Sequence, residues 1–82
     1  MSDAHLRNAI ACAILSDGTN AVGDYLKSLG DSEFHALMAL IRRILESPHA
    51  YDKGRVVEAF SQRYGFMLSS MEAEREARAA LT

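Results

Sequence analysis

Apolar residues recur every three or four positions through most of this chain, which is the spacing of one face of an α-helix. Residues 2–16 predict a first helix, which Asp17-Gly18 ends. Residues 19–29 predict a second, shorter helix, which ends before Gly30. The apolar faces of these two helices comprise Leu6, Ala9, Ile10, Ala13 and Ile14 in the first, and Val22, Tyr25, Leu26 and Leu29 in the second.

Residues 33–46 predict a third helix with an unusually wide apolar face. Seven side chains fall in one continuous arc of roughly 160°, whereas a stripe of about 100° is enough to meet one neighbouring helix. The wide arc therefore predicts contact with two or more helices, or with a second subunit. Its members are Phe34, Leu37, Met38, Leu40, Ile41, Ile44 and Leu45.

The remaining part of the chain predicts one or two further helices. Residues 47–54 form the longest connection, and residues 52–64 predict a fourth helix with Val56, Val57, Phe60 and Tyr64 facing inward. Gly65 is expected to break or kink this helix. Ser69-x-x-Glu72 is a capping-box pattern that predicts the start of a last helix.

No strand-like alternation is present, so the sequence predicts an all-α fold, a compact bundle of four to five short helices in a single domain over residues 1–82. A chain of this size is marginally stable by itself, and self-association is one way to offset that. Cys12 is the sole cysteine, which excludes an internal disulfide and favours a cytoplasmic location. No apolar run approaches the about 20 residues of a membrane span.

Residues with catalytic or metal-binding chemistry are scattered. His5, His35, His49 and Cys12 lack the close paired spacing of metal-binding modules, so no metal and no cofactor is expected. The carboxylates of the last predicted helix have no desolvating pocket of the kind that acid–base catalysis requires. We therefore expect that the protein is not an enzyme.

Residues 58–72, EAFSQRYGFMLSSME, resemble the spacing of a helix-turn-helix. The candidate nucleic-acid contacts under this interpretation are Arg55, Arg63, Arg75 and Arg78. However, the net charge is −2, and the helix that would enter the groove also carries Glu72, Glu74 and Glu76. Because affinity for nucleic acid depends on cations that neutralise phosphates, this charge pattern disfavours DNA binding.

The apolar residues around the glycine indicate a protein interface instead. They exceed what the inward faces need, and surplus apolar surface on a small chain is typical of an interaction site. The candidate interface residues are Phe66, Met67, Leu68 and Met71, together with Leu37, Ile41 and Ile44 from the third helix. The alternative is that these residues complete the core of one chain.

The sequence thus predicts a small non-catalytic regulator or adaptor that acts by protein–protein interaction. It could inhibit a larger protein or complex whose identity the sequence does not give, and a homodimer is expected. A helix-turn-helix transcriptional regulator is the alternative, and a purely structural subunit is a third possibility.

Overall fold

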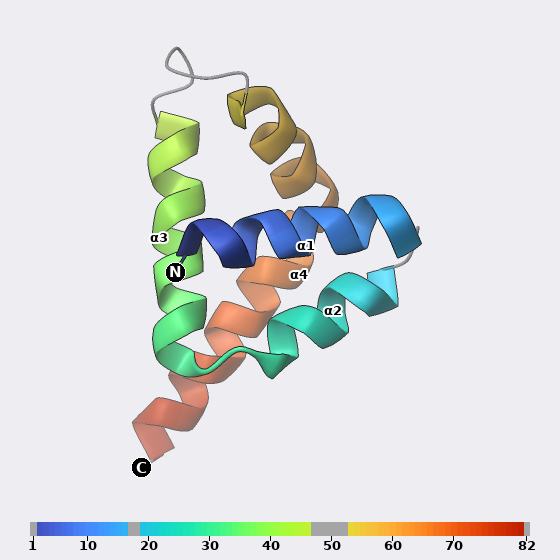
Figure 1. Cartoon of the computed structure of the whole chain (residues 1–82). Helices are drawn as coiled ribbons and strands as arrows, with labels where there is room; N and C mark the ends of the chain where they lie inside the picture. The colour runs from blue at the N-terminus through green and yellow to red at the C-terminus, as the bar shows by residue number, and fades with distance from the viewer. Residues whose placement is uncertain (1, 17–18, 47–52, 82) are drawn as a thin grey trace.

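The computed structural model describes residues 2–16, 19–46 and 53–81, and it places four helices in them (Figure 1). These are α1 (Ser2–Ser16), α2 (Thr19–Ser28), α3 (Asp31–Glu46) and α4 (Lys53–Leu81). No strand occurs in these three ranges, so the predicted all-α bundle is confirmed. The predicted stop at Asp17-Gly18 and the connection over residues 47–52 lie outside the described residues.

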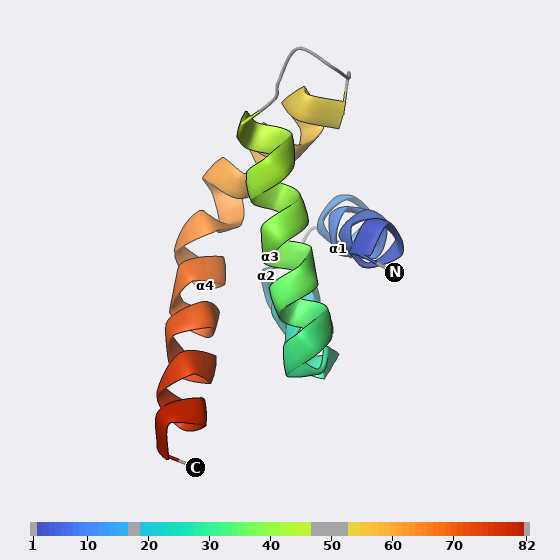
Figure 2. The ribbon, with the colours of Figure 1, turned by 90° about the vertical axis from the view of Figure 1, so that its left-hand side faces the viewer.

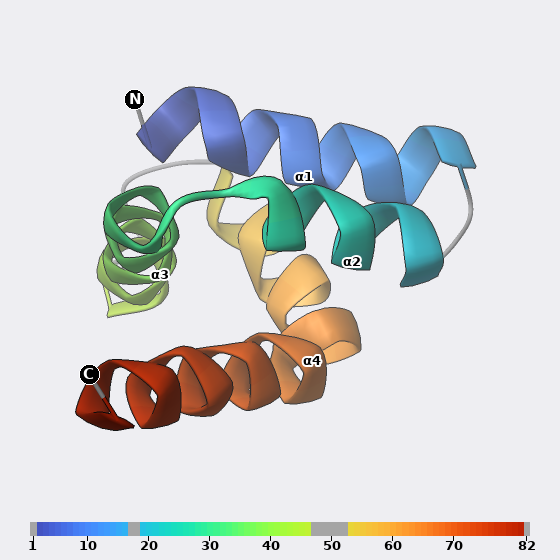
Figure 3. The ribbon, with the colours of Figure 1, turned by 90° about the horizontal axis from the view of Figure 1, so that it is seen from below.

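The helix α3 is the centre of the bundle and packs on both α1 and α4, while α1 also packs on α2. Viewed from the side, α3 lies between α1 and the second half of α4 (Figure 2). Viewed from below, α1 and α2 lie side by side, with the second half of α4 across from them (Figure 3). The prediction that α3 meets more than one helix is therefore confirmed.

The core is built from side chains of all four helices. Burial of each large aliphatic or aromatic side chain contributes roughly 1.5–3 kcal/mol. The buried apolar residues are Leu6, Ala9, Val22, Leu26, Leu29, Phe34, Leu37, Met38, Leu40, Ile41, Val57, Phe60, Tyr64 and Leu68. Five of these come from α3, so the chain itself covers most of the wide apolar arc.

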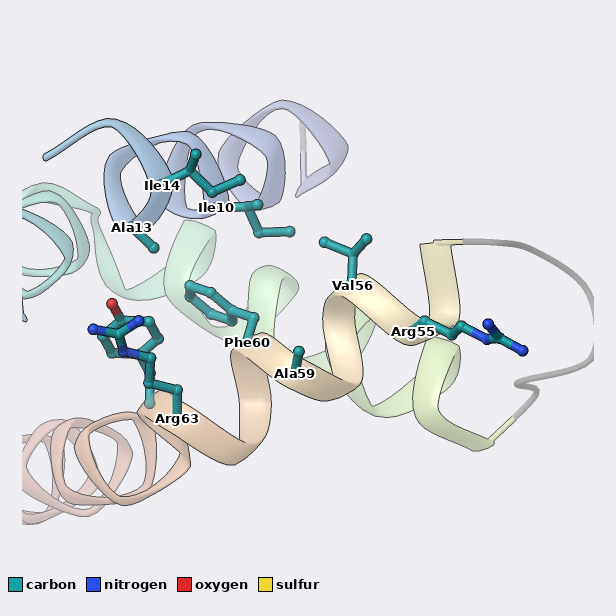
Figure 4. A pocket seen from close by; sticks show the side chains of 9 residues that line it. Ile10, Ala13, Ile14, Arg55, Val56, Ala59, Phe60 and Arg63 are labelled. Carbon is teal, nitrogen blue, oxygen red and sulfur yellow. The ribbon is translucent and has the colours of Figure 1, made fainter. Parts of the chain in front are cut away.

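The prediction of a separate last helix is wrong, because α4 continues through Gly65 without interruption. It bends close to Arg63, which agrees with the predicted kink (Figures 1 and 4). Glycine in a helix interior costs only about 1 kcal/mol relative to alanine. Burial of Tyr64 and Leu68 on either side of Gly65 outweighs that cost. The Ser69-x-x-Glu72 pattern therefore lies inside a helix and caps nothing.

Two ion pairs join the second half of α4 to α3. The Arg42 guanidinium of α3 donates to both carboxylate oxygens of Glu72 at 2.7 and 2.9 Å. Arg75 donates to Asp31 at 2.6 Å, and its side chain is only 7% exposed. Because a guanidinium offers several donors in a fixed fork, one side chain can bind more than one acceptor.

Arg75 also caps the carboxyl end of α2. Its Nη2 donates to the carbonyl oxygens of Leu29 at 2.8 Å and Leu26 at 3.1 Å. The last carbonyls of a helix have no partner within the helix. The Leu26 carbonyl also accepts the backbone N–H of Leu29 at 3.3 Å, and Arg75 provides a donor to both carbonyls. The guanidinium carbon also lies 4.4 Å from the centre of the Phe34 ring, which is within cation–π range.

A polar network joins the amino-terminal parts of α1 and α3 to α2. The His5 Nδ1 and the Tyr25 hydroxyl lie 2.8 Å apart, and the His5 Nε2 lies 2.9 Å from a carboxylate oxygen of Glu33. The other oxygen of Glu33 accepts the backbone N–H of Gly30 at 3.1 Å, as in a capping box. His5 therefore links three helices, where the sequence suggested no role for it.

Candidate functional site

An open groove lies between α1 and the first half of α4 (Figure 4). Its volume is about 510 Å³, which falls within the about 300–1,000 Å³ that is usual for ligand clefts. The side chains that α1 contributes point toward those of α4 across the gap. The lining residues are Ile10, Ala13 and Ile14 from α1, and Arg55, Val56, Ala59, Phe60, Arg63 and Tyr64 from α4.

The groove is lined mainly by apolar side chains, some of which belong to the core and some of which are open to solvent. Val56 is 48% exposed, so the prediction that it faces inward is wrong. Ile14 belongs to the predicted apolar face of α1 but is 71% exposed. The physical reason is the separation of the two walls. The helix α1 packs on α2 and α3 rather than on the first half of α4, so Ile14 has no opposing helix to cover it.

Two arginines stand at opposite ends of the groove, and no carboxylate is among the described residues that line it. Arg55 lies at the end near the start of α4, and Arg63 lies where α4 bends. The Arg63 guanidinium carbon is 5.5 Å from the centre of the Tyr64 ring. The lining therefore combines mainly apolar side chains with an arginine at each end.

Tyr64 is buried, and its hydroxyl lacks a hydrogen-bond partner among the described residues. An unsatisfied buried hydroxyl costs roughly 1–3 kcal/mol. Such groups are uncommon in native proteins, and each calls for an explanation. Tyr64 is one of the residues that line the groove.

The structure separates the predicted interface residues into three groups. Leu37, Ile41 and Leu68 are buried inside the chain, so no partner can reach them in this fold, which corrects their assignment. The second group is partly buried and packs against the core; it consists of Ile44, Met67 and Met71. Phe66 is 88% exposed and is fully available for contact.

Met67 and Met71 pack on α2 at Gly23. The Met67 sulfur and methyl carbon lie 3.8 Å from the position that a Cβ at Gly23 would occupy, and the Met71 methyl carbon lies 4.0 Å from it. Both methionines therefore help to join α4 to α2, which limits the surface that they offer to a partner.

The candidate nucleic-acid contacts are also dispersed. Arg75 is buried and bonded, so its assignment as a phosphate contact is corrected. Arg78 is exposed and lines a smaller cavity of about 280 Å³ together with Lys27 and Glu74. Arg55 and Arg63 belong to the groove at the other half of α4. Residues 58–72 form one continuous helix, so the two separate helices of a helix-turn-helix are not present there.

No family model, no curated protein and no solved structure matches this chain. Interpretation of the groove therefore depends on its own chemistry.

Two further features of the described residues bear on function. No three His, Cys, Asp or Glu side chains among them gather closely enough to hold a metal ion. Within the same ranges, no helix has both the length and the hydropathy that crossing a bilayer demands.

The sequence interpretation missed the groove because it placed the apolar residues of α1 in the core. One signal was available: Ile10 and Ile14 share their helix face with Arg7, an exposed cation. A face that is fully buried does not usually carry a charge one turn away.

Proposed function

We propose that this protein is a non-catalytic regulator or adaptor that binds another protein through the groove between α1 and α4. The supporting observation is the open apolar lining, in which Ile14 and Val56 remain exposed on an otherwise well-packed bundle. Apolar surface that the chain does not cover is typical of a binding site for a partner. The absence of catalytic function and a cytoplasmic location are parts of this proposal.

Exposed Phe66 extends the proposed surface along α4. Val56, Ala59, Arg63 and Phe66 follow one another at intervals of three and four residues, which is one face of a helix. The aromatic side chain thus continues the line of the groove beyond the bend. Aromatic residues are enriched at the energetic centres of protein interfaces.

The experiment is a comparison of three tagged proteins recovered from cells that contain the natural partners. The parent is compared with Ile14→Asp/Val56→Asp, which places charges in the groove, and with Leu81→Asp, which places a charge on an equally exposed apolar residue elsewhere. A partner that uses the groove is expected with the parent and with Leu81→Asp, and lost with the double variant. Identical recovery with all three proteins would contradict the proposal.

The homodimer remains a prediction with reduced support. The homodimer was expected partly because of the wide apolar face of α3. That face is mostly covered by α1 and α4 of the same chain. Among the described residues, the large apolar side chains that remain exposed are Ile14, Leu15, Leu45, Val56, Phe66 and Leu81. Light scattering at micromolar concentration tests it, since a constant mass of 9.0 kDa means a monomer.

A further inference from the structure

We propose that a second copy of this chain covers the outer face of the second half of α4, and that the two α4 helices pack antiparallel there. The outer face consists of six exposed residues, which are Phe66, Ser70, Ala73, Ala77, Ala80 and Leu81. This inference gives the expected homodimer a specific interface. It goes beyond the proposed function and does not depend on what occupies the groove.

The outer face lies opposite the side by which α4 joins the bundle. Leu68 and Arg75 are buried on the inner side of the helix. At about 100° per residue, Phe66, Ala73 and Ala77 fall on the opposite side. No other described helix lies beyond this half of α4, which forms one edge of the bundle (Figures 2 and 3). The described part of the chain therefore leaves the outer face uncovered.

The outer face has the composition of a contact surface rather than of a solvated one. A helix that packs on one side only usually carries its charged residues on the opposite side. Here the nearest charges, Glu74 and Glu76, stand on the two flanks, and the six residues between them in the helical projection are uncharged over about 100°. That arc is wide enough to meet one further helix. Phe66 and Leu81 are also 88% and 87% exposed, which leaves two large apolar side chains in water.

The order of large and small residues along the outer face favours a second copy as the occupant. A large apolar side chain stands at each end, at Phe66 and Leu81, and small residues stand between them. In an antiparallel pair centred between residues 73 and 74, Phe66 of one copy meets Leu81 of the other, because both are equally distant from the centre. Ser70 meets Ala77 of the second copy for the same reason. A two-fold interface requires such a pattern, since one patch must fit itself, whereas an unrelated protein imposes no such symmetry.

The small residues in the middle of the face allow the two helices to approach closely. Interaxial distances of packed helices are about 8–10 Å and depend on the side chains at the contact. Ser70, Ala73 and Ala77 place this pair near the lower value, which brings each end residue over the other helix. The contact runs over about 22 Å of helix axis from Phe66 to Leu81. It buries less than the about 1,200–2,000 Å² of a standard interface, so we expect a weak dimer with a dissociation constant of about 10 μM.

Sedimentation equilibrium over about 1–500 μM protein tests the interface. We expect the average mass of the parent to rise from 9.0 kDa towards twice that value. Phe66→Asp/Leu81→Asp should weaken the association at least about tenfold, because it places charges in an apolar contact. The matched control is Ile14→Asp/Val56→Asp, which adds the same two charges at exposed apolar residues of the groove and should leave the association unchanged. Circular dichroism verifies that both variants are folded.

Disulfide formation tests the orientation of the two helices, in a background in which Cys12→Ala removes the native thiol. Chains with Ser70→Cys are mixed with chains with Ala77→Cys. The proposed pairing brings these two positions together, whereas two copies of residue 70 lie about 10 Å apart along the axis. Since a disulfide requires Cα atoms within about 7 Å, we expect the mixed disulfide to form at least about tenfold faster than either chain pairs with itself.

The remaining outcomes overturn the inference. A constant mass of 9.0 kDa up to about 500 μM means that no dimer forms. A dimer that Ile14→Asp/Val56→Asp converts to monomer, while Phe66→Asp/Leu81→Asp does not, would place the contact in the groove. Faster pairing of Ser70→Cys with itself would show a parallel pair. A monomeric parent whose natural partner is lost with Leu81→Asp would show that a different protein covers the outer face.

Failure of the proposed function is seen separately. It would appear as equal recovery of every partner with the parent and with Ile14→Asp/Val56→Asp, whatever the mass of the parent.

Discussion

Replacement of Arg75 by alanine should remove a large part of the stability of this protein. The guanidinium is buried, donates to the carbonyls of Leu26 and Leu29, and lies over the Phe34 ring. Each hydrogen bond from a charged donor contributes about 1.5–3 kcal/mol, and the cation–π contact about 0.5–2 kcal/mol. The pair with Asp31 adds little, because that carboxylate is 67% exposed.

These contributions are not strictly additive, so we expect Arg75→Ala to lower the free energy of unfolding by about 3–6 kcal/mol. Small domains have about 5–15 kcal/mol in total. The melting temperature should fall by about 12 °C or more, since 1 kcal/mol corresponds to about 4–8 °C at this size. Urea denaturation followed by circular dichroism measures the loss directly.

Arg78→Ala is the matched control, because it removes an exposed arginine one turn further along α4. It should change the free energy of unfolding by no more than about 0.5 kcal/mol. Arg75→Met separates the two contributions of the side chain, since methionine keeps apolar contact with Phe34 but removes the guanidinium donor to the carbonyls of Leu26 and Leu29. Arg75→Lys should be intermediate, because an ammonium lacks the fork geometry. Equal stability of Arg75→Ala and Arg78→Ala would refute the conclusion that the buried Arg75 side chain stabilises the bundle.

Three further substitutions test the packing of the bundle by the same denaturation assay. Ile41→Ala should lower the free energy of unfolding by about 2–5 kcal/mol, because it leaves a cavity in the core; a shift in melting temperature of a degree or less would mean that the core is misplaced. Tyr64→Phe should be neutral or stabilise by about 1 kcal/mol, because it removes a buried hydroxyl without a partner. A clear loss of stability would show that the hydroxyl is bonded. Gly65→Ala should stabilise by up to about 1 kcal/mol, since a Cβ there meets no atom within 4 Å; destabilisation would show that the bend requires glycine.

Most of the helical architecture follows from local signals in the sequence. The bounds of α1, α2 and α3 agree with the predicted ranges within two residues, because glycines and capping residues stand between the helical ranges in the sequence. The wide apolar arc of α3 correctly indicated two neighbours. These features depend on neighbouring residues along the chain, so periodicity and capping rules are sufficient to find them.

Periodicity and capping rules did not predict that α4 is one continuous helix. Gly65 and the Ser69-x-x-Glu72 pattern both indicate a helix end, but tertiary packing at Tyr64 and Leu68 overrides them. Arg75 was predicted to be a surface cation. It stands seven residues after Leu68 and therefore lies on the same buried face of α4. Its acceptors are 44 to 49 residues distant in the sequence, and no local rule connects them.

The distance between Arg75 and the carbonyls that it caps has a consequence for synthesis of the protein. Leu29 leaves the peptidyl transferase centre 46 residues before Arg75. At about 5–20 residues per second, the carboxyl end of α2 waits about 2–9 s for its donor. The carbonyls of Leu26 and Leu29 are therefore made before their donor, and Arg75 can cap them only after the second half of α4 has been synthesised and released.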